Sequence, residues 1–192
     1  MKWKIAVLVA IGVDQEGYCQ VLGVMEGIKE DKESWRGFLR HLKERGLKGV
    51  QLVTSDKCLG LVEVLGEFYL EAAWQRCMFH WYRNEASQVP KTETKGVMAM
   101  LKAIHAQEDR DVAEKKAVDV VAKLRKQKLT KAAQCIEEGV SETLIYMVFL
   151  RELLDTDPDE QSAGGRFVNR KLVSWFGFLP GAKGAYNFRD FQ

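Results

Sequence analysis

The sequence predicts an α/β domain followed by an all-helical block. The first 90 residues alternate short apolar runs, which suit strands, with stretches whose apolar residues recur every three or four positions, which suit helices. Residues 95–149 keep only the helical spacing. After Arg151 the chain becomes acidic and then glycine-rich, without a clear period. We therefore divide it into an α/β portion at 1–90, a helical insertion at 91–150 and an irregular tail at 151–192.

Four strands are expected in one mixed sheet of the α/β portion. Residues 5–12 form an almost wholly apolar run rich in β-branched side chains, as in a strand buried on both faces. A turn leads from them into a second strand at 18–25, so the pair predicts an antiparallel hairpin. Two shorter strands are predicted at 50–54 and 72–76.

Helices are expected between and after these strands. Amphipathic spacing begins near Asp31, and Gly46 is expected to end that helix. Further helices are predicted at 59–68 and from Cys77 to about Val89, where Pro90 ends the pattern. Residues 95–149 predict three more helices, and the last of these is marked by Leu144, Met147 and Val148.

Composition favours an intracellular protein but names no partner. The 192 residues include 29 Lys and Arg against 27 Asp and Glu, so a net charge of +2 provides no strong bulk attraction for a polyanion. The four cysteines are widely spaced, and no charged head followed by a long apolar stretch opens the chain. We expect a reducing, cytoplasmic location without disulfides or membrane insertion.

Asp56 is the residue that points most directly to chemistry. It follows the predicted strand at 50–54, and the rim of an open α/β sheet is where ligand and catalytic groups tend to lie. A carboxylate there suits Mg²⁺, which prefers oxygen ligands. The competing interpretation is that Asp56 caps the helix that follows, and its position alone favours that cap.

Cys77 and His80 stand three residues apart, so they are expected to share a helix face. They have the chemistry of soft-metal ligands, and His80 also that of a proton carrier. A zinc site needs two more ligands, and no second Cys/His pair has a useful spacing. The other histidines, His41 and His105, are expected to be solvated or locally satisfied helix residues.

Two further features have both a nucleic-acid and a structural interpretation. Aromatic residues around the second short strand offer stacking surfaces to bases, or form core at a strand-to-helix junction: Trp74, Phe79, Trp81 and Tyr82. The segment 110–131 is rich in Lys and Arg, which suit phosphates. Its interspersed acidic residues favour an ordinary solvated helix face.

Ordered sequence blocks resemble the Mutator-type transposases of bacterial insertion sequences. The blocks are Ala6-x-Leu-Val-Ala-Ile-Gly-Val13, Val21-Leu-Gly-Val24, Glu30-Asp-Lys-Glu-Ser-Trp35, Leu42-Lys-Glu-Arg-Gly-Leu-Lys-Gly49, Ser55-Asp-Lys-Cys-Leu-Gly60, Gln75-Arg-Cys-x-x-His80 and Met100-Leu-Lys-Ala-Ile-His-Ala-Gln107. The match that these blocks mark runs in order from about residue 5 to residue 149.

The resemblance implies a ribonuclease H-like fold with a helical insertion and an Asp, Asp, Glu triad that holds two Mg²⁺ or Mn²⁺ ions for DNA cleavage and strand transfer. Asp56 matches the second Asp, so the resemblance identifies it as catalytic and metal-binding. Cys77 and His80 match a Cys-x-x-His signature near the active site, with an orienting or structural role. The implied partner is the terminal-repeat DNA of the insertion sequence, bound by a homo-oligomer.

Two departures from the family pattern suggest an inactive fragment. The first Asp and its central strand have no counterpart before the hairpin, which predicts an empty place in the sheet between the hairpin and the strand that precedes Asp56. The segment Leu154-Asp-Thr-Asp-Pro-Asp-Glu-Gln-Ser-Ala-Gly-Gly165 replaces the motif that carries the Glu. Read one nucleotide out of register, its codons can encode Arg-Thr-Asn and then Leu-Glu. We hypothesise a frameshift near residues 151–154.

Three functions therefore compete. The chain is a portion of a DNA-cleaving and joining transposase, a non-catalytic remnant that binds DNA or the parent transposase, or a ribonuclease H-like nuclease unrelated to transposition. The number of carboxylates distinguishes the first two, because one triad member cannot hold two metal ions. The third needs an Asp on an early strand, and none precedes Asp14.

Overall fold

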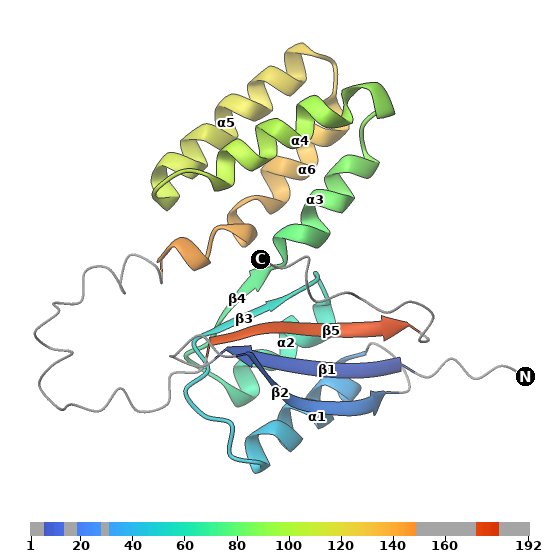
Figure 1. The fold of residues 1–192 in the computed structure, drawn as a ribbon, viewed down its shortest axis with the longest axis vertical. Helices are drawn as coiled ribbons and strands as arrows, with labels where there is room; N and C mark the ends of the chain where they lie inside the picture. The colour runs from blue at the N-terminus through green and yellow to red at the C-terminus, as the bar shows by residue number, and fades with distance from the viewer. Residues whose placement is uncertain (1–5, 14–18, 28–30, 149–171, 181–192) are drawn as a thin grey trace, which may run out of the picture. The chain divides into compact units, whose positions relative to one another are not determined.

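The computed structural model describes residues 6–13, 19–27, 31–148 and 172–180, and the chain forms two compact units (Figure 1). The first unit contains residues 1–53, 58–72 and 169–192, and the second contains 54–57 and 73–168. This grouping differs from a boundary at residue 90, because the last predicted strand of the α/β portion belongs with the helices. In the described ranges, no helix is both long and apolar enough to cross a membrane.

The first unit is built on the predicted hairpin. Strand β1 (Ala6–Val13) pairs antiparallel with β2 (Cys19–Gly27), and Ala6 lies opposite Gly27. The register shifts between Ala10 and Ile11, so one extra residue of β2 bulges out of the ladder. The hairpin is therefore confirmed within two residues at each end.

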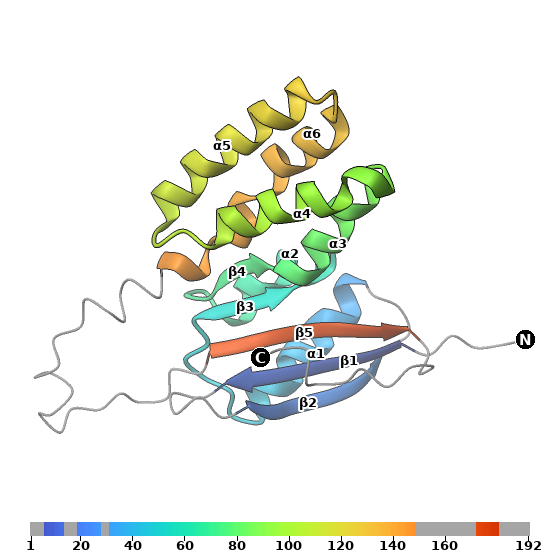
Figure 2. The same cartoon turned by 45° about the horizontal axis from the view of Figure 1, so that its top comes forward.

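A third strand, β5 (Leu172–Pro180), lies on the other side of β1. The strand order in this unit is β2-β1-β5-β3, where β3 is Leu52–Ser55 (Figure 2). Strand β5 pairs antiparallel with β1, with Pro180 opposite Ala6. The expectation of an irregular tail is wrong for residues 172–180, and so is that of an empty place beside the hairpin. The physical reason is that β1 presents backbone donors and acceptors that need partners.

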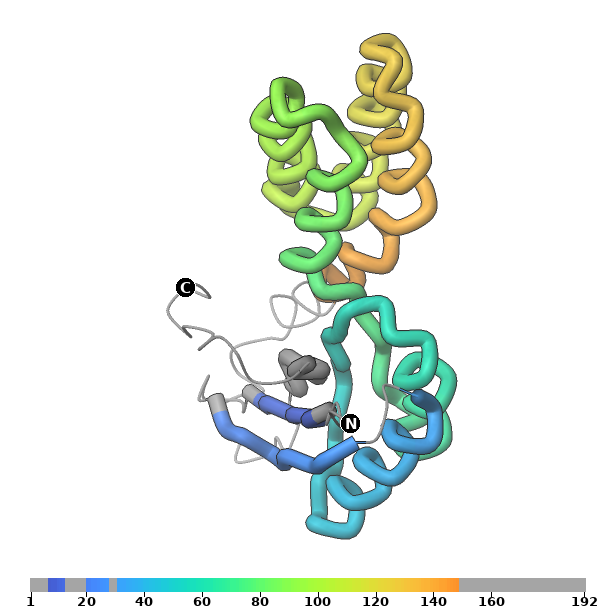
Figure 3. Tube along the Cα trace, turned by 90° about the vertical axis from the view of Figure 1, so that its right-hand side faces the viewer, coloured from blue at the N-terminus to red at the C-terminus, as the bar shows by residue number. Residues whose placement is uncertain are grey.

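Helices α1 (Lys32–Glu44) and α2 (Leu59–Phe68) lie on one side of the hairpin (Figure 3). Asp31 caps α1 by accepting a hydrogen bond from the backbone N–H of Ser34 at 2.9 Å. Gly46 follows the helix with a φ of +92°, in the left-handed region that glycine tolerates best, as the sequence predicts. The core between helices and sheet includes Leu8, Ala10, Trp35, Phe38, Leu39, Leu42, Leu61 and Val64.

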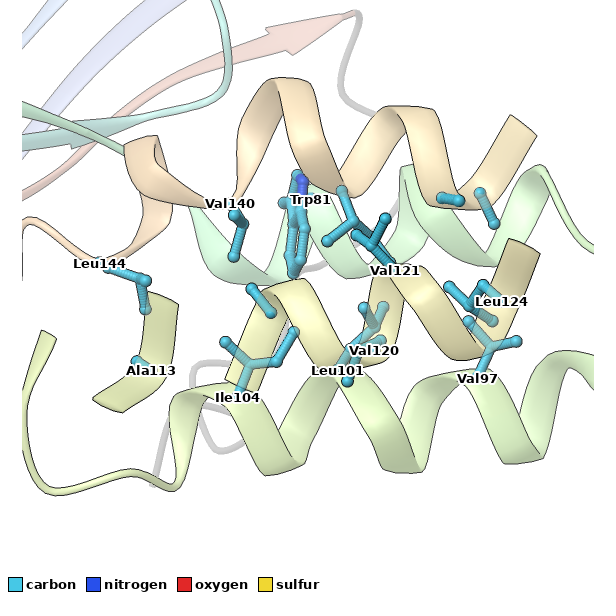
Figure 4. Packing of buried hydrophobic residues seen from close by; sticks show 14 of the residues in the cluster. Trp81, Val97, Leu101, Ile104, Ala113, Val120, Val121, Leu124, Val140 and Leu144 are labelled. Atoms are coloured by element: carbon cyan, nitrogen blue, oxygen red, sulfur yellow. The ribbon is translucent and has the colours of Figure 1, made fainter. Parts of the chain in front are cut away.

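The second unit begins where β3 passes Thr54, and β4 (Ala73–Arg76) is the next strand. Among the described residues, helices α3 (Met78–Ser87), α4 (Lys91–His105), α5 (Arg110–Lys126) and α6 (Thr130–Gly139) follow, with a 3₁₀ turn at Ser141–Thr143. They enclose a core around Trp81, Leu101, Ile104, Leu124 and Ile136 (Figure 4). Helix α3 ends at Ser87, two residues before the predicted end at about Val89, and Pro90 stands at the N-cap of α4.

Candidate functional site

Asp56 lies immediately after β3 and is exposed to solvent. Helix α2 begins only at Leu59, with Cys58 at its N-cap, so the capping interpretation of Asp56 is wrong. Its carboxylate oxygen Oδ1 instead accepts a hydrogen bond of 2.8 Å from the backbone N–H of Lys57. The carboxylate is thus held at the strand's end by its own neighbour and remains accessible to a ligand.

Ser55 fixes the backbone that carries Asp56. Its side chain is only 1 % exposed, and its backbone oxygen accepts a hydrogen bond of 2.7 Å from the N–H of Cys77. The Ser55 hydroxyl accepts a hydrogen bond from Trp74 Nε1 at 2.9 Å and donates one to the Asp56 backbone oxygen at 2.7 Å. The end of β3 is therefore hydrogen-bonded to Trp74 in β4 and to Cys77 at the N-cap of α3.

Cys77 and His80 come together at this junction, although α3 begins at Met78 and leaves Cys77 at the N-cap. Burial raises the pKa of the Cys77 thiol, but its interaction with His80 and nearby backbone N–H groups outweighs this and leaves the pKa below its usual value. The same interaction raises the pKa of His80 against the effect of burial, and the charge of Asp56 adds to the rise. Each group of the pair therefore shifts the pKa of the other towards its charged form.

The charge of Asp56 acts on His80, so the structure brings the three predicted site residues into one neighbourhood. His80 Nδ1 is buried and has no hydrogen-bond partner of standard geometry within the described part of the chain. His80 is placed to influence Asp56, since an imidazolium stabilises a neighbouring carboxylate and repels a cation.

Ionic residues that the sequence analysis did not single out surround this site. Lys57 Nζ lies 2.8 Å from Glu142 Oε1, and Arg76 Nη1 lies 3.6 Å from Glu142 Oε2. Behind Arg76, the Glu85 side chain is 2 % exposed, and burial raises its pKa to about 7 although Arg76 acts to lower it. Glu142 is 85 residues from Lys57 in the sequence, so no local spacing could have revealed their contact.

Most of the aromatic residues at this junction serve as structure. Trp81 is fully buried in the helical core, and Trp74 is half-buried with its N–H bound to Ser55. The Tyr82 hydroxyl lies 2.8 Å from His105 Nδ1, so His105 is locally satisfied as expected, while His41 is exposed. Phe79 differs from the others because it is 59 % exposed.

The described residues fit one hard metal ion only in part. Asp56 offers an exposed carboxylate, the ligand that Mg²⁺ and Mn²⁺ prefer. Among the residues that the structure describes, no group of three or more His, Cys, Asp or Glu side chains is arranged to hold a metal ion. These residues do not fit a two-metal centre, because the repulsion between two divalent cations requires several carboxylates.

Comparison with known proteins connects this geometry to a family. The sequence model described as "Transposase, Mutator family" matches residues 3–156. The chain is 38 % identical over 149 residues to the transposase for insertion sequence element ISRM5 of Rhizobium meliloti, covering 77 % of this chain and 37 % of that protein. It is 35 % identical over 160 residues to the IS1081 transposase of Mycobacterium tuberculosis, covering 80 % and 38 %.

A third relative is the transposase for IS256 in transposon Tn4001 of Staphylococcus aureus. It is 33 % identical over 141 residues, which are 73 % of this chain and 36 % of that transposase. The alignments with these three relatives therefore span less than two fifths of each relative's length.

Proposed function

The chain belongs to the Mutator family of transposases, and we propose that it supplies part of a catalytic domain for metal-dependent DNA cleavage and strand transfer. In this proposal Asp56 is a catalytic carboxylate and binds Mg²⁺ or Mn²⁺. The observation that carries it is an exposed Asp just beyond β3, not used as a helix cap, whose charge acts on His80. The DNA partner is the terminal repeat of an insertion sequence, bound by a homo-oligomer.

The proposal includes a ribonuclease H-like fold with α4 to α6 as its helical insertion. Its support is the succession of hairpin, helix, strand with terminal Asp, helix and strand in the described residues. Cys77 and His80 are positioning residues in this proposal. Their charges, together with the bonds of Ser55, set the electrostatic environment and the backbone position of Asp56.

We propose further that this 192-residue chain is inactive by itself. A bound metal ion would polarise a phosphodiester or activate water, but Asp56 is the only carboxylate that we assign to the metal site. The alternative function is a non-catalytic module that binds DNA or the parent transposase. It is favoured by the lack of a metal-ligating group of three among the described side chains.

Manganese titration of the full, isotope-labelled chain tests the role of Asp56. Bound Mn²⁺ should broaden the amide signals of Lys57 and His80, and the Asp56→Asn variant should lose this broadening. Asp111→Asn is the matched control, because Asp111 is also exposed but lies on α5. Equal broadening in wild type and Asp56→Asn would show that Asp56 does not bind the ion. Mg²⁺-dependent cleavage by the wild-type chain that Asp56→Asn abolishes would overturn the proposed inactivity.

We retain the hypothesis of a frameshift near residues 151–154, which lie outside the described residues. It is supported by the family match, which covers residues 3–156 and not the residues that follow. The DNA sequence of the gene checks it directly. The shifted frame must encode Arg-Thr-Asn followed by Leu-Glu, and any other reading contradicts the hypothesis.

A further inference from the structure

The turn between α5 and α6 concentrates positive charge. Residues 123–131 contain five basic residues and no acidic one, and all five are exposed: Lys123, Arg125, Lys126, Lys128 and Lys131. Figures 1 and 3 show this turn at the end of the helices that lies away from β4. We call these five residues the α5–α6 basic turn.

The charges of the α5–α6 basic turn are poorly balanced compared with those at the start of α5. There, Asp109 caps the helix and Arg110 pairs with Glu114 at 2.8 Å. In the turn, Arg125 pairs with Glu137 at 2.6 Å. Within the part of the chain that the structure describes, none of the four lysines has an ion pair. The acidic residues that favoured a merely solvated face therefore all precede Lys123 in the sequence.

Lys128 occupies a position where lysine is costly. Its φ is 64°, and it is the only described non-glycine residue with a positive φ. The Leu129 N–H bonds to the Leu124 oxygen and the Lys128 N–H to the Arg125 oxygen, which is the Schellman pattern at a helix C-terminus. Glycine is the usual residue at this position because a side chain strains the left-handed backbone.

Lys131 is also placed against a local preference. It lies in the first turn of α6, which contains no acidic residue. The N-terminal end of a helix carries a partial positive charge, so a lysine there is repelled, whereas basic residues such as Lys123 and Lys126 in the last turn of α5 are stabilised. The helix dipoles thus favour Lys123 and Lys126 and disfavour Lys131.

We infer that the α5–α6 basic turn binds the phosphate backbone of double-stranded DNA without reading its sequence. An external polyanion compensates both the uncancelled charge and the unfavourable placement of Lys128 and Lys131. DNA is the partner because the chain belongs to a transposase family, so the inference rests on the proposed function. The turn holds a flanking stretch of duplex while Asp56 acts on another part of the DNA.

The test measures binding of the full chain to a labelled 20-base-pair duplex between 50 and 200 mM salt. Lys128→Gly/Lys131→Gln should reduce the slope of log K against log salt by about 0.9 for each phosphate that the protein no longer neutralises. At 50 mM salt each neutralised phosphate is worth on the order of tenfold in affinity. Lys115→Gln/Lys116→Gln is the matched control, since it removes the same charge from exposed positions of α5 that lie outside the basic turn.

A smaller decrease in affinity for the control supports the inference, and equal decreases in both double variants overturn it. An unchanged affinity in Lys128→Gly/Lys131→Gln also overturns it. A decrease confined to terminal-repeat DNA would exclude sequence-independent binding, so unrelated duplex must be affected to the same degree. Binding is measured in EDTA, without divalent metal, which keeps this result separate from the test of the proposed catalytic site.

The single Lys128→Gly variant separates binding from stability. It should unfold at the same or a higher temperature than wild type, because it relieves the left-handed backbone, while its duplex affinity falls. A variant with lower thermal stability and unchanged affinity would show that Lys128 has a purely structural role.

Discussion

His105 illustrates how a histidine that the sequence places on an ordinary helix becomes part of a polar network. Its Nε2 lies 2.8 Å from the Thr143 hydroxyl, which itself donates a hydrogen bond of 2.6 Å to the Val140 oxygen. Thr143 has already used its proton, so His105 Nε2–H must be the donor between them. Nδ1 then accepts from the Tyr82 hydroxyl at 2.8 Å. The network requires a neutral imidazole with its proton on Nε2.

This network predicts loss of stability in acid. Burial lowers the pKa of His105, partly offset by the Leu101 carbonyl, so the folded-state pKa lies below that of the unfolded chain. The contribution is therefore complete above the unfolded pKa of about 6.5 and is lost as pH falls through the folded pKa. His80, whose pKa is raised, changes in the opposite direction. We expect the free energy of unfolding to fall more steeply below pH 6.5 in wild type than in His105→Gln.

Urea unfolding at pH 7.5 and 5.5 makes this comparison. At pH 7.5, His105→Gln should be destabilised by about 1–3 kcal/mol, because the hydroxyls of Tyr82 and Thr143 lose their shared partner. His41→Gln is the control, since His41 is exposed and should change neither value appreciably. The same pH dependence in wild type and His105→Gln would contradict this account of the network.

At the scale of elements, the predictable parts are those whose neighbours in sequence determine them. Strands β1 and β2 are predictable from long apolar runs joined by a turn. The place of Asp56 is predictable because it comes directly after β3. Helix α6 was missed because its buried positions are mostly small, namely Ala132, Ala133 and Gly139 beside Ile136. At Gly139 a Cβ would lie 2.7 Å from Arg76 Nη1 and 3.0 Å from Trp81 Nε1. A small residue is needed at Gly139 because of contacts with residues distant in the sequence, and such contacts leave no periodic pattern in the sequence of the helix.

Strand β5 gives a testable prediction about the sheet. A chain shortened to residues 1–148 lacks the strand that pairs with β1, so backbone groups along one edge of β1 lose their partners. Each buried unpaired group costs about 1–3 kcal/mol. We expect the amides of β1 to exchange at least roughly tenfold faster with solvent deuterium in the shortened chain. Peptides from α5 serve as the internal control, and equal exchange of β1 in both chains would contradict pairing with β5.

At the scale of the whole molecule, the chain passes four times between the two compact units, because residues 54–57 and 73–168 form one unit and residues 1–53, 58–72 and 169–192 form the other. The candidate site lies in the second unit, because Asp56, Cys77, His80 and Glu142 all belong to it. Its geometry therefore depends on the helical core around Trp81 as well as on the strand that precedes Asp56. The sequence alone does not show this dependence, because Glu142 is far from Asp56 along the chain.

Each unit has its own buried core, so each should unfold as its own cooperative transition in calorimetry. Leu39→Ala in the first unit and Leu101→Ala in the second are a matched pair, because both side chains are fully buried in helices. Each substitution removes the same atoms and should cost about 2–5 kcal/mol, lowering the melting temperature of its own unit by roughly 4–8 °C per kcal/mol. The other transition should keep its temperature, since distant sites contribute independently. A single transition that both variants lower equally would mean that the shared strand β3 couples the two cores into one folding unit.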